Sequence, residues 1–265
     1  MPMGNITRSV RAALRVLLMG CACACAWALA DTAALDVRVA SQAVLEPKWL
    51  HDGERIVGIC PDIMAAIERI EPRLHFVGYQ RNSRSLSGIE TGLDTGSLDA
   101  ACGLVSSPRR LAIGQPVGKP LFFVRHYLAV RKDDPVTITS TADLARLGDL
   151  VTTQRASVFT QRLREAGVRV DDATDDNRVN LRKILAGHGR FAYVNDLTLR
   201  YLIREENLED RVRVLPVILG DEPMYFWIGH KADPALAPLL GAALDRLKAS
   251  GELDRIYARW AAPAP

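Results

Sequence analysis

Residues 98–110 read Leu-Asp-Ala-Ala-Cys-Gly-Leu-Val-Ser-Ser-Pro-Arg-Arg, the pattern of a strand that leads directly into a helix. Most residues before Gly103 are small or apolar, which suits a buried strand of a parallel sheet. Ser107 and Pro108 are the residue types that favour the N-cap and the first position of a helix. The stretch therefore predicts a strand, a glycine break and a helix start within thirteen residues.

Arg110 falls in the first turn of this predicted helix. A cation there opposes the helix dipole, which costs about 0.3–1 kcal/mol at an exposed position, so we expect a compensating group nearby. One interpretation is a guanidinium that points over the carboxyl end of the strand and binds a carboxylate through two hydrogen bonds. The other is a solvated surface arginine, and the local pattern leaves both open.

The chain around this stretch alternates predicted strands and helices. Residues 36–105 follow the order strand, helix, strand, helix, strand, which predicts a parallel α/β sheet with right-handed crossovers. Ligands of such sheets bind beyond the carboxyl ends of the strands. Trp49, Cys60, Val105 and Arg110 are all expected at that edge.

The second half of the chain continues the alternation. Predicted strands cover 126–135, 150–154, 191–194, 212–218 and 225–229, and predicted helices cover 157–166, 179–186, 197–204, 235–249 and 252–261. We interpret the acidic pairs Asp171-Asp172 and Asp175-Asp176 as part of a solvated loop.

The N-terminus has the features of a secretory signal peptide. Arg8, Arg11 and Arg15 precede a short apolar run, and an Ala-x-Ala site ends at Ala30. The apolar run is too short to favour a membrane span, so we predict export with cleavage near Ala30. The sequence before Cys21 also resembles a lipobox, which leaves a lipoprotein anchored through Cys21 as an alternative.

The charge balance argues against a nucleic-acid partner. The formal net charge is +3, but residues 1–30 hold three arginines and no acid, which leaves 31 basic and 31 acidic residues in the predicted mature chain. A balanced domain lacks the electrostatic footprint of a nucleic-acid-binding protein.

Two cysteines remain after the predicted cleavage. Cys21, Cys23 and Cys25 leave with the signal peptide, whereas Cys60 and Cys102 stay in the exported chain. An oxidising compartment favours pairing them, and both are expected near the same edge of the sheet. We predict a disulfide between them, with two buried free thiols as the alternative.

Motifs for covalent or metal chemistry are absent from the predicted mature sequence. It contains no Gly-x-Ser-x-Gly elbow, phosphate-binding glycine loop or Cys-x-x-Cys pair, and its five histidines form no i, i+4 pair. We therefore expect no catalytic residues, no metal and no cofactor.

Several motifs after residue 35 resemble those of the family 3 extracellular solute-binding proteins, which bind polar amino acids and related solutes for ABC transporters. The residues around Ser107 and Arg110 resemble the family's Gly-x-x-Ser/Thr-x-x-Arg signature. Residues 251–260 resemble its C-terminal Gly-x-x-x-x-Ile-x-x-Lys-Trp. Residues 58–63 resemble its Gly-Phe-Asp-x-Asp-Leu helix opening, with Cys60 where the motif carries an acid.

The resemblance implies an α/β fold of the periplasmic binding protein type II, or Venus-flytrap, class. This fold has two lobes, parallel-rich sheets flanked by helices and two hinge crossings. We expect the signal peptide at 1–30, lobe 1 at 31–124 plus 223–265, and lobe 2 at 125–222. The expected protein is a periplasmic monomer that closes by hinge motion and delivers its solute to an ABC permease in the inner membrane.

The resemblance also implies a ligand site. In the family, the signature arginine grips the ligand's α-carboxylate, a loop of the second lobe holds it from the other side, an aromatic residue packs on the ligand, and an Asp accepts its ammonium. The matching positions, with Val105 in place of a frequent Ser, are Trp49, Val105, Arg110, Ala156, Ser157 and Asp196. Two alternatives stay open, because Trp49 could fill the lobe's core and Asp196 could cap the following helix.

The expected function is capture of a small carboxylated polar solute, an amino acid or an analogue. Cys60, Val105 and Arg155 depart from the family's usual residues, which suggests an unusual pocket. Two alternatives are a periplasmic enzyme of the cyclohexadienyl dehydratase type, using Glu46 or Asp196 as its acid, and a non-transport accessory protein of a quinoprotein dehydrogenase system.

Overall fold

The computed structural model describes residues 34–261. From Leu35 onward, the chain forms one compact unit. The predicted signal peptide, its cleavage site and Cys21 lie outside the described residues. No helix among residues 34–261 combines the length and the apolar character needed to cross a lipid bilayer.

The first half of the described chain contains the predicted strands and helices, with further short strands between them. Its elements are β1 (Leu35–Arg38), β2 (Ser41–Gln42), β3 (Leu50–Asp52), β4 (Arg55–Val57), α2 (Ile59–Ile70), β5 (Leu74–Val77), β6 (Ser83–Arg84), α3 (Leu86–Thr95), β7 (Ala100–Leu104) and α4 (Pro108–Ile113). Ser107 caps α4 by accepting a hydrogen bond from the backbone N–H of Arg110 at 3.3 Å, and Pro108 opens the helix.

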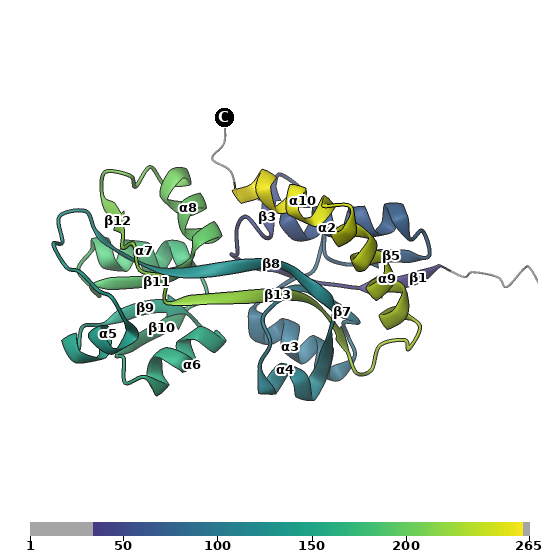
Figure 1. The fold of residues 1–265 in the computed structure, drawn as a ribbon, viewed down its shortest axis with the longest axis horizontal. Helices are drawn as coiled ribbons and strands as arrows, with labels where there is room; N and C mark the ends of the chain where they lie inside the picture. The colour runs from purple at the N-terminus through teal and green to yellow at the C-terminus, as the bar shows by residue number, and fades with distance from the viewer. Residues whose placement is uncertain (1–33, 262–265) are drawn as a thin grey trace, which may run out of the picture. The chain divides into compact units, whose positions relative to one another are not determined.

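The second half contains the longest strands. Its elements are β8 (Gly114–Arg131), α5 (Thr141–Leu147), β9 (Val151–Gln154), α6 (Val158–Glu165), β10 (Val170–Thr174), α7 (Asn177–Leu185), β11 (Phe191–Asn195), α8 (Asp196–Glu205), β12 (Val212–Val214), β13 (Gly220–Gly229), α9 (Leu236–Ala249) and α10 (Glu252–Ala261). Figure 1 shows β8 and β13 side by side, with α5 to α8 around one end of the pair and α2, α3, α4, α9 and α10 around the other.

The sheets combine parallel and antiparallel pairs. A seven-stranded sheet has the order β10-β9-β11-β8-β13-β7, with β12 also paired to β8. The pairs β10-β9 and β9-β11 are parallel, whereas β8 runs antiparallel to β11, β12 and β13. β1 and β5 form a separate parallel pair. The expected α/β architecture, with sheets flanked by helices, is confirmed.

The buried apolar residues gather around the two ends of the long strands. The largest cluster joins α2, α9 and α10 to β1, β5 and the nearer parts of β8 and β13. Two further clusters lie around β9, β11 and the helices α6, α7 and α8. The lobe boundaries at residues 124 and 223 stay a prediction, which these separate clusters support.

Two strand predictions need correction. The strand predicted at 126–135 is longer at its start, because residues 114–125 extend β8 and most of them pair with β13. Asp171 and Asp172 lie in β10 and form ion pairs of 2.6 Å with Lys183 and Arg164, so they are not part of a solvated loop.

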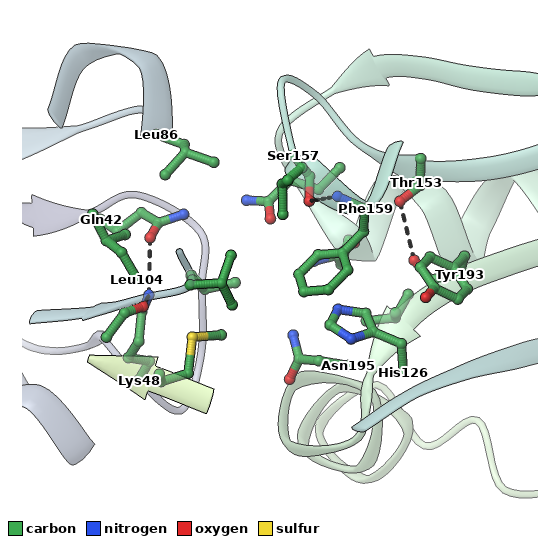
Figure 2. Close-up of a pocket in the computed structure, with 18 of the residues that line it drawn as sticks. Gln42, Lys48, Leu86, Leu104, His126, Thr153, Ser157, Phe159, Tyr193 and Asn195 are labelled. Carbon is green, nitrogen blue, oxygen red and sulfur yellow. Dashed lines mark hydrogen bonds between the residues drawn. The ribbon is translucent and has the colours of Figure 1, made fainter. Parts of the chain in front are cut away.

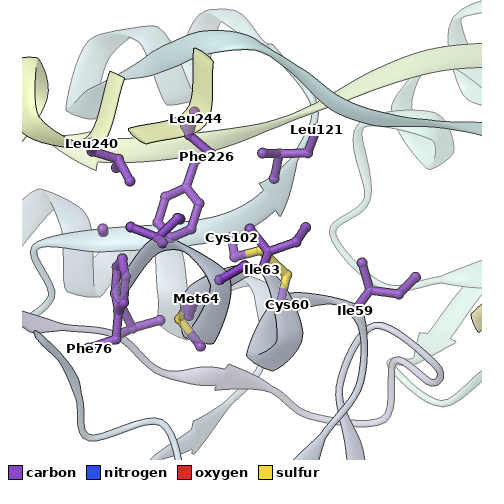
Figure 3. Packing of buried hydrophobic residues seen from close by; sticks show 14 of the residues in the cluster. Ile59, Cys60, Ile63, Met64, Phe76, Cys102, Leu121, Phe226, Leu240 and Leu244 are labelled. Carbon is purple, nitrogen blue, oxygen red and sulfur yellow. A yellow bond between two sulfur atoms is a disulfide. The ribbon is translucent and has the colours of Figure 1, made fainter. Parts of the chain in front are cut away.

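Cys60 and Cys102 form the disulfide that the sequence favoured. It joins the start of α2 to β7 across 42 residues of chain. Both cysteines are buried among apolar side chains that include Ile63 and Phe226 (Figure 3). The bond therefore ties the helix that follows the Pro47 loop to the strand that precedes Arg110.

Candidate functional site

A cavity lies at the carboxyl ends of three strands, where the parallel α/β pattern predicts a ligand. Leu104, Gln154 and Asn195 are the last residues of β7, β9 and β11, and all three line it. The complete lining is Gln42, Leu45, Lys48, Leu86, Gly103, Leu104, Val105, Arg110, His126, Thr153, Gln154, Ser157, Val158, Phe159, Asn177, Tyr193, Val194, Asn195 and Met224. Figure 2 shows the labelled side chains on two facing walls, with Gln42, Lys48, Leu86 and Leu104 on one of them.

Lys48 is the cation of the first wall. Its side chain is buried and donates hydrogen bonds to Gln42 Oε1 at 3.0 Å and to the carbonyl of Gly103 at 2.8 Å. Burial, followed by the nearby positive charge of Arg110, lowers the pKa of Lys48 to about 7. Lys48 was not among the predicted site residues, although a charged residue between Pro47 and Trp49 was an available signal.

Three rings form part of the opposite wall (Figure 2). The His126 ring lies 3.7 Å from the Phe159 ring centroid and 5.1 Å from that of Tyr193. His126 is buried, and its Nδ1 has no hydrogen-bond partner among the described residues. Burial, with a smaller effect of the Arg162 charge, lowers the pKa of His126 to about 3.

This burial predicts a pH dependence of stability. The unfolded chain protonates His126 below its ordinary pKa of about 6.5, whereas the folded protein keeps it neutral down to about pH 3. Stability is therefore lost as pH falls from 6.5, at up to about 1.4 kcal/mol per pH unit. Urea denaturation between pH 6.5 and 5 should show this slope in the wild type and a smaller slope in His126→Gln. Equal slopes would contradict the assignment.

Arg110 reaches the edge of the cavity as expected, but its charge is compensated inside the protein. Its Nε donates to Glu90 Oε1 at 3.0 Å and its Nη1 to the carbonyl of Val105 at 2.8 Å. The side chains of Arg110 and Glu90 are 4% and 8% exposed, so the pair is buried. The compensating group that the helix dipole requires is thus Glu90 of α3, and Val105 supplies a carbonyl to the arginine while it lines the cavity.

Ser157 lies at the cavity and Ala156 does not. The Ser157 hydroxyl caps α6 by accepting a hydrogen bond from the backbone N–H of Phe159 at 3.2 Å. Ala156 has a φ of 57° and is exposed on a neighbouring depression beside Arg109. Arg110 and Ser157 line the same depression as Ala156, so a role of the Ala156 and Ser157 amides beside Arg110 stays a prediction.

Trp49 also lies outside the cavity lining. It is 3% exposed and packs in the core, with its ring centroid 6.0 Å from that of Tyr79. A turn closed by the hydrogen bond from Trp49 N to Leu45 O directs Lys48 to the cavity and Trp49 to the core. The alternative of a core tryptophan is the one observed, since burial of its large apolar ring is favourable.

Asp196 and Glu46 are likewise placed elsewhere. Asp196 Oδ1 accepts a hydrogen bond from the backbone N–H of Arg125 at 3.1 Å, and burial raises the pKa of this carboxyl. It lines a separate depression, and the cap of α8 is Asn195, whose side chain accepts from Thr198 N at 3.0 Å. Glu46 is buried in an ion pair outside the cavity lining.

Comparisons with solved structures show the fold that the chain shares. A mutant of ArgBP from T. maritima is 20% identical with a TM-score of 0.71, and the match covers 85% of this chain and 94% of that one. The ancestral amino acid-binding protein AncCDT-1, a precursor of cyclohexadienyl dehydratase, is 21% identical with a TM-score of 0.70 and coverages of 86% and 96%. The GluR0 ligand-binding core from Nostoc punctiforme, in complex with L-glutamate, is 18% identical with a TM-score of 0.70 and coverages of 84% and 98%.

The sequence comparisons settle the family. A search of curated proteins finds no significant match. The family profile of the bacterial extracellular solute-binding proteins, family 3, matches residues 37–263, which is nearly all of the chain after the predicted signal peptide. Together with the helix opening at Ser107 and the cavity at the strand ends, this match shows that the chain belongs to the family 3 bacterial extracellular solute-binding proteins.

Proposed function

We propose that this protein is a periplasmic receptor that captures a small carboxylated solute and delivers it to an ABC permease in the inner membrane. The main support is the cavity. Its walls come from the elements around both ends of the long strands β8 and β13. Residues 31–124 and 223–265 would form one lobe and residues 125–222 the other, with the long strands as the hinge. Such lobes close around a solute by hinge motion.

The charges of the cavity lining favour an anionic group on the solute. Lys48 and Arg110 are its charged residues, and Asp and Glu are absent from the part of the lining that the structure describes. The first wall therefore presents positive charge to a bound molecule, as capture of a carboxylate requires.

An ion pair between the two predicted lobes would stabilise the closed arrangement. Arg178, in the first turn of α7, donates from Nη1 to Glu46 Oε1 at 3.0 Å, with side chains 22% and 12% exposed. We expect Glu46→Gln to weaken solute binding about three- to tenfold, because it removes about 1 kcal/mol from the closed state only. Titration calorimetry measures this change.

Glu206→Gln is the matched control for this ion pair. Glu206 contacts the same guanidinium, at 3.0 Å from Arg178 Nε, but both residues belong to the second predicted lobe. This variant should leave the affinity unchanged. Equal losses from the two variants would contradict a role of Glu46 in closure.

A thermal-shift screen tests the proposed function. The purified protein would be scanned against amino acids, small organic carboxylates, polyamines and prephenate. A micromolar ligand at millimolar concentration stabilises the folded state by about 4 kcal/mol, which gives a clear shift. Absence of any shift with carboxylated solutes would overturn the receptor proposal.

The similarity to a precursor of cyclohexadienyl dehydratase keeps an enzyme as the second candidate. Such an activity needs an acid at the reacting group. Glu46 and Asp196, the acids expected for this role, lie outside the cavity lining. A spectrum recorded during incubation with prephenate or arogenate distinguishes the candidates, because a receptor leaves both compounds unchanged.

A further inference from the structure

We propose that the solute is an organic carboxylate without an ammonium group, and that Lys48 supplies the positive charge that binds it. This inference rests on the proposed receptor function and names the chemical class of its ligand.

The described cavity lining offers no carboxylate to pair with an ammonium group. An α-amino acid brings one negative and one positive charge into the cavity, but the described lining holds two cations and no carboxylate. A buried charge without an opposite charge is strongly disfavoured. Asp196, the family's candidate for this role, lies in another depression and receives a hydrogen bond from the backbone of Arg125.

The two cations of the cavity differ in how their charges are compensated. Arg110 is paired with Glu90, so its charge is already compensated. Lys48 contacts only neutral acceptors, Gln42 Oε1 and the carbonyl of Gly103, and forms no ion pair among the described residues. An ammonium has three N–H donors, so one remains for a ligand oxygen.

Apolar and aromatic side chains form much of the remaining cavity lining. Leu45, Leu86, Leu104, Val158 and Met224 present apolar side chains to the cavity. On the wall that faces Leu86 and Leu104, the rings of Phe159, His126 and Tyr193 lie against one another and present an aromatic surface to a planar or hydrocarbon body (Figure 2).

The protonation of Lys48 supplies a readout that requires no mutation. Its pKa is lowered to about 7 in the ligand-free protein, and a bound carboxylate would raise it. The charged groups on the elements around it are Arg110 of α4 and its partner Glu90 of α3, and His126 and Arg162 lie on the other side of the cavity. Binding at pH 8 should therefore take up close to one proton, and affinity should fall up to about tenfold per pH unit above pH 7.

Matched pairs of probes test the ligand class. 3-Phenylpropanoate differs from L-phenylalanine only by the ammonium group, and 4-methylpentanoate differs from L-leucine in the same way. We expect at least one carboxylate to bind ten or more times tighter than its amino acid in titration calorimetry. Measurements at pH 8 in phosphate and in Tris, whose ionisation enthalpies differ, report the proton uptake.

Variants of two lysines test the residue. Lys48→Met keeps the length of the side chain and should reduce carboxylate affinity at least tenfold and abolish the proton uptake. Lys119→Met, at an exposed position of β8 away from the cavity, should change neither. Circular dichroism checks that both variants are folded, and the proton uptake of the wild type tests Lys48 even where Lys48→Met is not folded.

The outcomes separate this inference from the receptor function. Tighter binding of the amino acids would overturn the inference and leave the receptor proposal intact. Carboxylate binding without proton uptake, and unaffected by Lys48→Met, would overturn the role of Lys48. Failure of all four probes would overturn the ligand class, and the receptor proposal fails with it only where the wider screen also finds no carboxylated solute.

Discussion

Replacing Arg110 with alanine is expected to lower the free energy of unfolding by about 3–5 kcal/mol, because it leaves Glu90 buried without its main partner. Both side chains are less than a tenth exposed, so water compensates poorly for the lost contacts. The carbonyl of Val105 also loses a donor at 2.8 Å. Arg109 remains 2.7 Å from the other oxygen of Glu90, which favours the lower end of the range. Urea denaturation measures the change.

Two controls separate the buried pair from a general effect of charge. Arg109→Ala removes an arginine that is 70% exposed and contacts the same carboxylate, and we expect a loss of no more than about 1 kcal/mol. The double variant Glu90→Leu, Arg110→Met replaces both charges by apolar groups and should recover most of the stability. An unaltered stability of Arg110→Ala, accompanied by loss of solute binding, would instead support the carboxylate-binding role that the family resemblance implies.

Reduction of the Cys60–Cys102 disulfide is expected to lower the free energy of unfolding by about 4 kcal/mol, as calculated from the entropy of the loop that it closes. The loop spans 42 residues and includes α2 from Cys60 onward and all of α3. In the unfolded state the intact bond limits this loop, whereas the reduced chain explores more conformations. Equilibrium urea denaturation of the wild-type protein, with and without a thiol reductant, measures the difference in stability.

The double variant Cys60→Ala, Cys102→Ala controls for effects of the reductant itself. It should unfold at the same urea concentration with and without reductant. Its stability should lie at or below that of the reduced wild type, because both sulfur atoms are buried in the core and their removal leaves small cavities. A wild type whose midpoint does not respond to reductant would contradict the predicted stabilisation.

Local sequence patterns predicted many of the elements that carry the fold. The helix start at Ser107-Pro108 and the closing helices α9 and α10 lie where capping and periodicity placed them, because these signals depend on neighbours within a few residues. The pairing of Cys60 and Cys102 was also predictable, since the predicted mature chain contains only these two cysteines. Strand ends were less accurate: β8 begins at Gly114, and its pairing with β13 is a long-range contact.

The patterns and the family resemblance of the sequence were enough to predict the α/β class, the family and the edge of the sheet where the cavity lies. The direction of each side chain at that edge depended on the tertiary structure. Glu90 compensates Arg110 across 20 residues, and one turn directs Lys48 to the cavity and Trp49 to the core. Neither result follows from local pattern. Arg110 is buried beside an acid and Lys48 is buried without one only when separate elements of the chain pack together.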